Sequence, residues 1–599
     1  MRLIAFVLAA GFVSAVVADE PMRNPFRDGT GKASPDKPLA ASQPKTDVKP
    51  EPIKPDPIKQ APRVIRAAEM GVGTLVPDVA FTDLKGKPGK LSDFKSSKLL
   101  VVAMTDPGCP LCKKYAPTLA AIEKEYSVKG ISFLLVNPSA KSGANLAGAL
   151  GARSTTEVFV LDSTRTLLYR GAVDDQYGLG YATDAPKNNY LKAALDAALA
   201  GKPPVIGATT APGCELELAD GGLQKEITYH ARIGRIVQQN CVECHRAGGL
   251  APFPLETYDQ VVAKKAAIMR VVNDRTMPPW FAAPAAKGEH SLWSNDRSLT
   301  EADRADLLAW VSGDLKKGDA ADGPLPRTFE SGWLIGKPDA VVQMPQPIAI
   351  KATGTMPYQM ISVDVNNEEE RWVQAMEVQP SARAVVHHVL IFALPKGAPR
   401  AAGEAQGFFA AYVPGNNTLV YPEGYAKKLP KNATITFQMH YTPNGTATED
   451  QTRFGMIFVK EKPRYEVKVA ALANNRFSIT PGDDNYKIEA KMPYVPWNAR
   501  VLAFFPHAHL RGKAARYDVK FPDGTAKTLL DVPHYDFNWQ LMYRFAEPVS
   551  LPRGSSLTYT AWYDNSDKNP ANPDPKRAVP WGPQTYDEMH LGYLEYVLE

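Results

Sequence analysis

The stretch AVVHHVLIFA, residues 384–393, is a run of β-branched and aromatic residues with the length of one buried strand. Comparable runs recur downstream: NATITFQMHY (432–441), RVLAFFPHAHL (500–510) and SLTYTAWYDN (556–565). Turn sequences such as PNG at 443–445 separate these runs. Short strands without intervening helices are typical of sandwiches and jelly rolls. Because residues 326–599 are too many for one sandwich, we expect two jelly rolls, 326–465 and 466–599.

Mixed and helical patterns lie upstream of this all-β region. Buried strand patterns and helical stretches alternate between 67 and 207, at 98–104, 109–126, 131–136, 158–161 and 189–199. Such alternation predicts an α/β layer domain. Residues 208–325 read as mostly helical, and their last helix, 299–315, opens with a capping Thr300. The chain is therefore predicted to be multidomain, with an α/β domain, an all-α domain and an all-β region of two jelly rolls.

The N-terminus reads MRLIAFVLAAGFVSAVVADE, in which a basic Arg2 precedes a short apolar run. We interpret residues 1–18 as a secretory signal peptide, because the run is short for a membrane span and a polar stretch follows. Residues 19–66 are rich in Pro, Lys and Asp and predict a disordered linker. No other stretch has the roughly 18 continuous apolar residues of a membrane span. We therefore expect a periplasmic or secreted protein without a stable membrane span after signal removal.

The sequence CVECH at 241–245 is a CxxCH motif in a chain predicted to be exported. Thioether bonds from Cys241 and Cys244 would hold a covalent c-type haem, with His245 as the proximal iron ligand. Met277, in a loop stiffened by prolines, is the best candidate for the second ligand, and His230 is a weaker one. The alternative is a structural zinc or disulfide site beside an accidental histidine. With this order of motifs, residues 208–325 resemble a small class I cytochrome c.

The first CxxC pair along the chain, Cys109 and Cys112, follows a strand pattern and opens a helix. A helix N-terminus stabilises a thiolate, so Cys109 is the candidate nucleophile and Cys112 the resolving thiol. Residues 67–207 resemble the redoxin branch of the thioredoxin fold, although Thr156 stands where relatives place a cis-proline. A passive disulfide is the alternative. Cys214, in the following linker, is interpreted as a free thiol or a regulatory partner of the pair.

Histidines are concentrated in the all-β region. His507 and His509 are spaced i, i+2, so on a strand both point to one face. His387 and His388 are adjacent, so joint ligation by both needs a twist or bulge in the strand. His440 ends another strand pattern. Imidazole and thioether ligands together favour copper over magnesium or calcium.

Four motifs, AVVHHVLIFA, FQMHYTPNG, HAHLRGK and YDEMHLGYLEYV, resemble in this order the copper type II ascorbate-dependent monooxygenases, the peptidylglycine and dopamine hydroxylases. The resemblance implies two copper ions, one in each jelly roll, on either side of an open cleft. It assigns the electron-storing copper to His387, His388 and His440. The oxygen-activating copper is assigned to His507, His509 and Met589, and Tyr593 matches a substrate-side tyrosine. Phe505 replaces the arginine that holds a peptide carboxylate, so a C-terminal glycine peptide is not the expected substrate.

These parts together predict an oxidoreductase that hydroxylates a C–H bond of an unidentified organic substrate with O2. Electrons would come from an ascorbate-like reductant or a periplasmic redox protein and pass through the fused haem. One alternative is an electron-transfer or copper-handling protein without monooxygenase activity, and another is a thiol–disulfide oxidoreductase. The formal net charge of +5 is small for 599 residues and gives no reason to expect a nucleic-acid partner.

Overall fold

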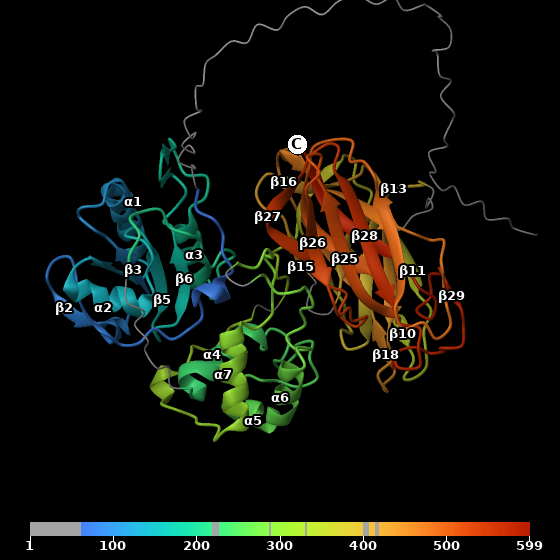
Figure 1. Ribbon diagram of the computed structural model, residues 1–599, viewed down its shortest axis with the longest axis horizontal. Coiled ribbons are helices and arrows are strands. Elements are labelled where there is room, and N and C mark those ends of the chain that lie inside the picture. The colour runs from blue at the N-terminus through green and yellow to red at the C-terminus, as the bar shows by residue number, and fades with distance from the viewer. Residues whose placement is uncertain (1–60, 218–226, 287–288, 330–331, 399–406, 414–417) are drawn as a thin grey trace, which may run out of the picture.

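The computed structural model describes residues 61–217, 227–286, 289–329, 332–398, 407–413 and 418–599. An α/β domain, a helical part and a large β region follow one another along the chain (Figure 1). The predicted signal peptide and nearly all of the predicted linker lie outside the described residues. Among the residues that are described, no helix has the length and apolar character needed to cross a membrane.

The α/β domain is built on a four-stranded sheet with the order β4-β3-β5-β6. Its strands are β3 (Leu99–Met104), β4 (Ile131–Val136), β5 (Val158–Asp162) and β6 (Leu167–Gly171). Every residue of β3 is buried, because helices cover both faces of the sheet. Helices α1 (Pro110–Ser127) and α3 (Tyr190–Leu199) pack on the face that presents Val101, and α2 (Lys141–Leu150) packs on the face that presents Val102. The α/β prediction is confirmed, and the three expected strands, β3, β4 and β5, end within a residue of the expected positions. Strand β6 and helix α2 were not expected from the sequence.

The helical part has a core of its own, which includes Ile233, Val237, Leu307 and Trp310. Its elements are η3 (Tyr229–Ile233), α4 (Gly234–Asn240), α5 (Tyr258–Ala263), α6 (Lys265–Asn273) and α7 (Glu301–Ser312). The predicted cap of the last helix is present, since the Thr300 hydroxyl accepts the Asp303 N–H at 3.0 Å. The structure thus has the predicted helical segment, and its classification as a cytochrome c stays a prediction.

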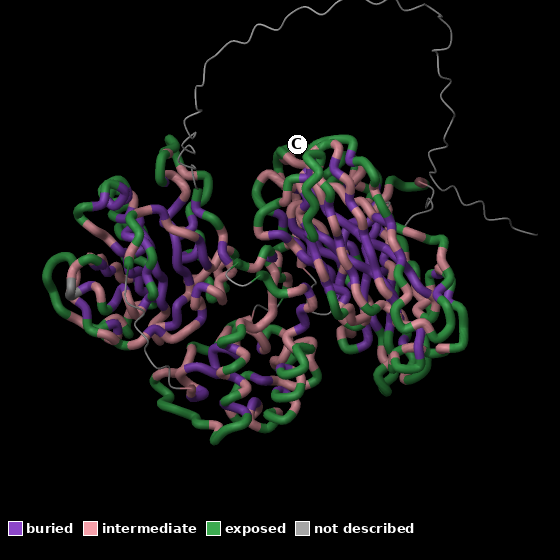
Figure 2. Tube along the Cα trace, viewed as in Figure 1, coloured by how far each residue is buried: buried purple, intermediate pink, exposed green. Residues whose placement is uncertain are grey.

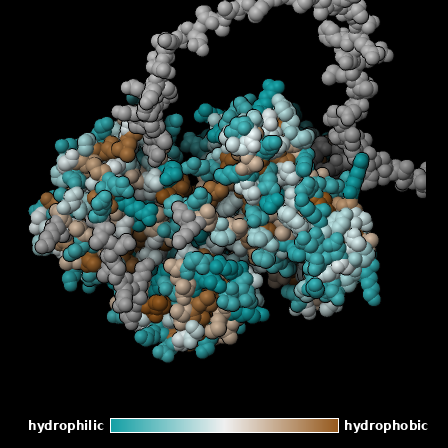
Figure 3. Space-filling view, in the orientation of Figure 1, coloured by the Kyte–Doolittle hydropathy of each residue, from teal (hydrophilic) through white to brown (hydrophobic). Residues whose placement is uncertain are grey.

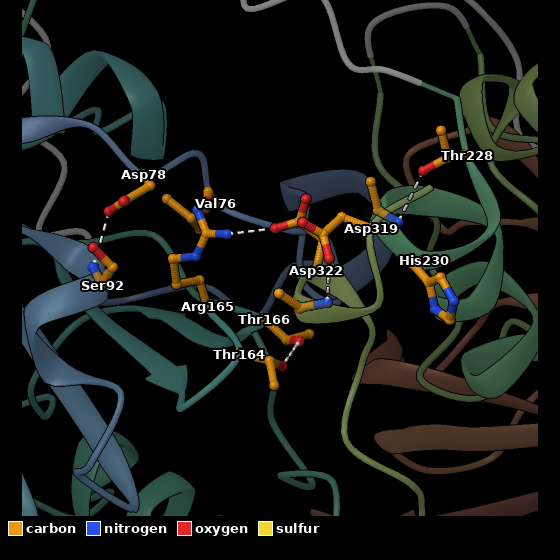
Figure 4. Close-up of polar contacts among 12 residues, drawn as sticks. Val76, Asp78, Ser92, Thr164, Arg165, Thr166, Thr228, His230, Asp319 and Asp322 are labelled. Carbon is orange, nitrogen blue, oxygen red and sulfur yellow. Dashed lines mark hydrogen bonds and ion pairs between the residues drawn. The ribbon is translucent and has the colours of Figure 1, made fainter. Parts of the chain in front are cut away.

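Polar contacts join the helical part to the α/β domain (Figure 4). Arg165 forms an ion pair with Asp322 at 2.6 Å. The side chain of Arg235 is fully buried and donates to the Thr164 carbonyl, the Thr166 hydroxyl and the Asp322 carbonyl. A buried guanidinium is tolerated only when such acceptors replace water, so these bonds fix the relative position of the two units.

The segment that follows α6 leaves the helical part and packs against the β region. Trp280 and Trp293 are buried there, with Trp293 stacked on Phe545 at a centroid distance of 4.5 Å. The Ser294 N–H donates to the Arg544 carbonyl and the Ala546 N–H donates to the Leu292 carbonyl. This stretch falls within the predicted helical unit, residues 208–325, and that assignment is wrong for it, because aromatic burial attaches Trp280 and Trp293 to the second jelly roll.

The β region consists of two double-sheet units, as the strand pattern predicts. The first has the sheets β11-β17-β13-β14 and β20-β16-β12-β19-β9. Their bounds are β9 (Ala340–Gln343), β11 (Gln359–Asp364), β12 (Arg371–Gln379), β13 (Val386–Pro395), β14 (Phe408–Tyr412), β16 (Tyr425–Leu429), β17 (Ala433–Tyr441), β19 (Arg453–Phe458) and β20 (Tyr465–Glu466). Alternate residues of β17, from Ala433 to Phe437, are fully buried, which places one face of this strand in the core.

The second unit has the sheets β21-β30-β24-β27 and β23-β28-β25-β26. Their bounds are β21 (Lys468–Ala473), β23 (Tyr486–Met492), β24 (Ala499–His507), β25 (Gly512–Lys520), β26 (Ala526–Val532), β27 (Tyr543–Leu551), β28 (Ser556–Tyr563) and β30 (Leu591–Leu598). Buried residues alternate with partly exposed ones along β23 and β25, and Figure 2 shows the buried residues gathered along the strands of the β region. The visible outer face of the molecule is largely hydrophilic (Figure 3). An apolar cluster that includes Leu390, Phe408, Phe505 and Tyr593 joins the two units.

Candidate functional site

Three histidines of the first jelly roll form one group, the HHH group, made of His387, His388 and His440. The ligand atoms that these side chains offer all lie within 4.8 Å of one another. His388 on β13 pairs directly with His440 on β17, and the pairing shifts register between Val386 and His388. This bulge allows adjacent residues to face one site, which the sequence analysis required of His387 and His388.

Two histidines of the second jelly roll form the HxH pair, His507 and His509. His507 ends β24, and the two ring centroids are 5.4 Å apart. The Nδ1 atom of His507 is 2.7 Å from Gln540 Oε1, and that of His509 is 3.2 Å from the Asp587 carbonyl oxygen. Both acceptors require a proton on Nδ1, so the lone pair of each ring lies on Nε2.

The HHH group and the HxH pair lie next to each other. The ring centroids of His388 and His507 are 6.4 Å apart. Phe537 lies between the two groups, stacked on His387 at 4.7 Å and 6.3 Å from His509. The resemblance implied an open cleft between the sites, and this expectation is wrong for the structure. The apolar cluster between the jelly rolls holds the two units together, and their histidines therefore meet.

Burial keeps these imidazoles neutral near pH 7. It lowers the pKa of His387 to about 4 and, together with the charges of His387 and His507, lowers that of His440 to about 3. Burial also lowers the pKa of His507 to about 4, although its hydrogen bond to Gln540 acts in the opposite direction. Among the described residues, buried His387 Nε2, His440 Nδ1 and His509 Nε2 have no hydrogen-bond partner. Neutral imidazoles with unused lone pairs fit a soft or borderline metal cation.

Glu588 connects the HxH pair to the segment before β30 that carries Met589. Its carboxylate is fully buried and accepts the backbone N–H groups of His509, Arg511 and Met589 at 2.8, 2.7 and 3.2 Å. Burial raises the pKa of Glu588 to about 7 in spite of these hydrogen bonds. Met589 itself is buried, in the apolar cluster between the jelly rolls. The sequence analysis identified Met589 but not Glu588, Gln540 or Phe537, which carry no metal-ligand pattern.

Tyr593 lies in the same apolar cluster. Its side chain is 2% exposed and is stacked on Phe408 at 5.1 Å and on Phe505 at 5.8 Å. The ring thus packs between the two jelly rolls. A substrate-side role for Tyr593 stays a prediction.

The CxxCH motif begins at the C-terminal end of α4, where Cys241 is the cap residue. The His245 N–H donates to the Cys241 carbonyl at 2.9 Å, and His245 Nδ1 is 3.0 Å from the Phe253 carbonyl oxygen. That carbonyl requires a proton on Nδ1, which leaves Nε2 as the ligand atom. Met277 is partly buried just after α6, while His230 packs edge-on against Tyr229. The presence of a haem stays a prediction.

The first CxxC pair is placed as the sequence predicts, with Cys109 as the N-cap of α1 and Pro110 as its first residue. Thr155 contacts both thiols. Its hydroxyl donates to Cys109 Sγ at 3.2 Å, and its carbonyl accepts from Cys112 Sγ at 3.0 Å. Burial opposes ionisation of Cys109, but hydrogen bonds from Thr155 and Cys112 lower its pKa to about 7. Burial raises the pKa of Cys112 to about 11. The sequence analysis pointed to Thr156, one residue from the observed contact.

Comparison with protein families gives two matches. A model described as copper type II ascorbate-dependent monooxygenase, C-terminal domain, matches residues 475–599. The chain carries a copper type II monooxygenase C-terminal domain. A model described as Redoxin matches residues 71–196. The α/β unit is therefore a thioredoxin-like redoxin domain, and no curated protein matches the chain.

Three solved structures are similar to parts of the chain. A hypothetical protein from Sinorhizobium meliloti is 26% identical, covering 27% of this chain and 100% of that one, with a TM-score of 0.23. An uncharacterized conserved protein from Geobacillus kaustophilus is 22% identical, covering 26% and 95%, with a TM-score of 0.22. The thioredoxin domain of a thiol-disulfide oxidoreductase from Bacteroides vulgatus is 17% identical, covering 16% and 86%, with a TM-score of 0.15.

The monooxygenase domain contains the HxH pair and Met589, whereas the HHH group lies outside the matched residues. The family implies copper for this domain. The redoxin domain contains Cys109 and Cys112, and residues 197–474 lie in neither match.

Proposed function

We propose that this chain is a copper-dependent monooxygenase that hydroxylates a C–H bond of an organic substrate with O2, outside the cytoplasm. The observation that carries the proposal is the meeting of the HHH group and the HxH pair at one buried place. Buried imidazoles without partners are costly unless a metal uses their lone pairs. The family of the C-terminal domain names copper as that metal.

His387, His388 and His440 would hold one copper ion, and His507, His509 and Met589 would hold the other. Bound copper supplies one-electron chemistry and the activation of O2. The protein contributes orientation: Gln540 and the Asp587 carbonyl hold protons on Nδ1 of His507 and His509, which keeps Nε2 available. Phe537 contributes an apolar ring near three of these imidazoles, those of His387, His440 and His509.

We further propose that a c-type haem on Cys241, Cys244 and His245, with Met277 as second ligand, supplies the electrons. The segment after Met277 supports this role, because Trp280 packs on Tyr543 of the copper domain at 4.9 Å. A haem tethered beside its acceptor makes electron transfer intramolecular. The electrons would enter from an ascorbate-like reductant or a periplasmic redox protein.

The direct test is oxygen consumption by the reduced, copper-loaded chain. His507→Ala and Met589→Ala should reduce copper-dependent oxygen uptake to background. His534→Ala is the matched control, since His534 is exposed and belongs to neither proposed copper-ligand set. This variant should keep wild-type oxygen uptake. Wild-type uptake that stays at background with a panel of organic substrates would favour an electron-transfer or copper-handling protein.

A second activity is favoured by the thiol site alone. Cys109 combines an N-cap position with a pKa near 7, which suits a thiol–disulfide oxidoreductase. Insulin reduction by the chain, abolished in Cys109→Ser, would support it. Unchanged insulin reduction in Cys109→Ser would exclude this role for the pair.

A further inference from the structure

The segment that follows the redoxin domain lies across its thiol site. The Thr155 N–H donates to the Cys214 carbonyl at 3.0 Å, and the Leu216 N–H donates to the Arg153 carbonyl at 3.1 Å. Ser154 and Glu215 form an antiparallel bridge between these hydrogen bonds. The segment is therefore bound as an extended peptide, by backbone hydrogen bonds, against the loop that contacts Cys109 and Cys112.

A glycine sets how closely this segment approaches. Gly213 has φ +143°, and a Cβ atom on it would lie 2.4 Å from Ser154 Oγ and 3.0 Å from Thr155 Oγ1. The Ser154 hydroxyl also donates to the Pro212 carbonyl at 2.9 Å. Only a residue without a side chain permits this contact, so Gly213 fixes the register of the segment on the loop.

The register places a third sulfur beside the CxxC pair. The Cys214 N–H donates to the Thr155 hydroxyl at 3.0 Å, and that hydroxyl donates to Cys109 Sγ. Interaction with the neighbouring Cys109 thiol raises the pKa of Cys214. Cys112 completes the group through the Thr155 carbonyl.

Access differs sharply among these three thiols. Cys109 is 3% exposed and Cys112 is 5% exposed, whereas Cys214 is exposed to solvent. A protein thiol approaching from outside can therefore reach the sulfur of Cys214 directly. It can reach Cys109 only after the segment leaves the loop.

We propose that Cys214 is a third redox-active cysteine, which forms a disulfide with Cys109 and exchanges electrons between the buried CxxC pair and an external dithiol or disulfide. This role goes beyond the copper chemistry and does not depend on it. It makes the segment around residue 214 part of the redox site.

The exchange inside the chain conserves electrons. Starting from a Cys109–Cys112 disulfide, the Cys214 thiolate attacks Cys109 Sγ, the Cys109–Cys214 bond forms, and the bond to Cys112 breaks. The Cys112 thiolate takes up a proton, and the Thr155 carbonyl accepts a hydrogen bond from the resulting thiol. One disulfide replaces another, so no oxidant or reductant is consumed.

The external step moves two electrons. One thiolate of an external dithiol attacks the exposed Cys214 Sγ, forming a mixed disulfide, and Cys109 leaves as a thiolate. A leaving thiol with a low pKa departs faster, and Cys109 has the lowest pKa of the three. The second external thiol then displaces Cys214, so the partner is oxidised to its disulfide and the chain is reduced.

The first test traps the new bond in the full chain. Cys112→Ser protein is oxidised with diamide, digested without reduction and analysed by mass spectrometry. We expect most chains to contain a Cys109–Cys214 disulfide. Cys109→Ser is the matched control. A Cys112–Cys214 disulfide should be absent from it, because the Cys112 thiol is buried and hydrogen-bonded to the Thr155 carbonyl. If Cys109 and Cys214 both remain open to alkylation in oxidised Cys112→Ser protein, the proposal is overturned.

The second test keeps all thiols and moves the segment. Gly213→Ala should displace it, lower the rate of Cys109–Cys214 formation by about tenfold through loss of proximity, and speed alkylation of reduced Cys109. Gly86→Ala is the matched control, since Gly86 has φ +81° and no atom within 4 Å of an added Cβ. Equal rates in the two variants would contradict the proposed docking.

Discussion

The chain carries the CxxC pattern twice, once at the N-terminus of helix α1 and once at the C-terminus of helix α4. The two pairs differ in chemistry. Cys109 caps the N-terminus of α1, and its pKa is lowered to about 7. Cys241 caps the C-terminus of α4, where desolvation and the charge of Cys244 raise its pKa to about 12. A helix stabilises negative charge at its N-terminus and not at its C-terminus. The CxxC spacing alone therefore does not predict the reactivity of the two thiols, because their position on the helix also matters.

Neighbouring groups reinforce the difference between the two pairs. Thr155 donates to Cys109 and accepts from Cys112, which separates a nucleophile from a protonated thiol. The second pair is followed directly by His245, whose ring the Phe253 carbonyl orients. The first pair is organised for exchange between sulfurs, and the second is organised around a histidine.

The largest expected effect is on covalent haem. With the cytochrome c maturation apparatus present, the Cys241→Ser, Cys244→Ser double variant should lose all haem that survives denaturation, because both thioether sulfurs are gone. The Cys109→Ser, Cys112→Ser double variant should keep all of it. Haem staining of a denaturing gel with mass analysis measures both. Covalent haem retained in the first variant, or absent from the wild-type chain, would show that Cys241 and Cys244 are not a haem-attachment pair.

A smaller effect is the pH dependence of alkylation in the chain prepared without haem. The pKa of Cys109 is lowered to about 7, so its thiolate fraction and its rate with iodoacetamide should reach half their maximum near pH 7 and level off about one pH unit higher. The rate of Cys241 should still be rising at pH 10, because its pKa is raised. The midpoint of each profile is measured by peptide mass spectrometry, and it does not depend on how slowly the reagent enters. Coincident midpoints would show that the surroundings of the two pairs do not separate the pKa values of Cys109 and Cys241.

The smallest effect isolates one hydrogen bond. Thr155→Val removes the hydroxyl that donates to Cys109, so the midpoint for Cys109 should move upward by about one pH unit, the effect of one hydrogen bond to a charged group. Thr155→Ser should restore it. Thr156→Val is the matched control, since the Thr156 hydroxyl is buried without a hydrogen-bond partner in the described part of the chain. A shift of equal size in Thr156→Val would mean that packing, and not the hydrogen bond, sets the pKa.

Local pattern was enough to predict much of the fold. The apolar run LLVVAM has no alternative to a strand buried on both faces, and β3 is that strand. Adjacent His387 and His388 required a bulge if they were to act together, and the register shift lies there. In both cases the residues that decide the structure are close in sequence.

Features set by distant contacts escaped prediction. Trp280 and Trp293 join the core of the second jelly roll because Tyr543 and Phe545 offer aromatic faces, and nothing near them in sequence indicates this. The closeness of His388 and His507 depends on packing between two whole units. The contact of Cys214 with Cys109 depends on a backbone pairing between segments about sixty residues apart.

The most direct test of the central claim, that the converging histidines hold copper, is the copper content of the purified chain after loading and removal of loose metal. We expect one tightly held copper ion for each histidine group, a lower copper content in His388→Ala, and an unchanged copper content in His534→Ala. A wild-type chain that retains no copper, or a His388→Ala chain that retains as much as His534→Ala, would contradict it.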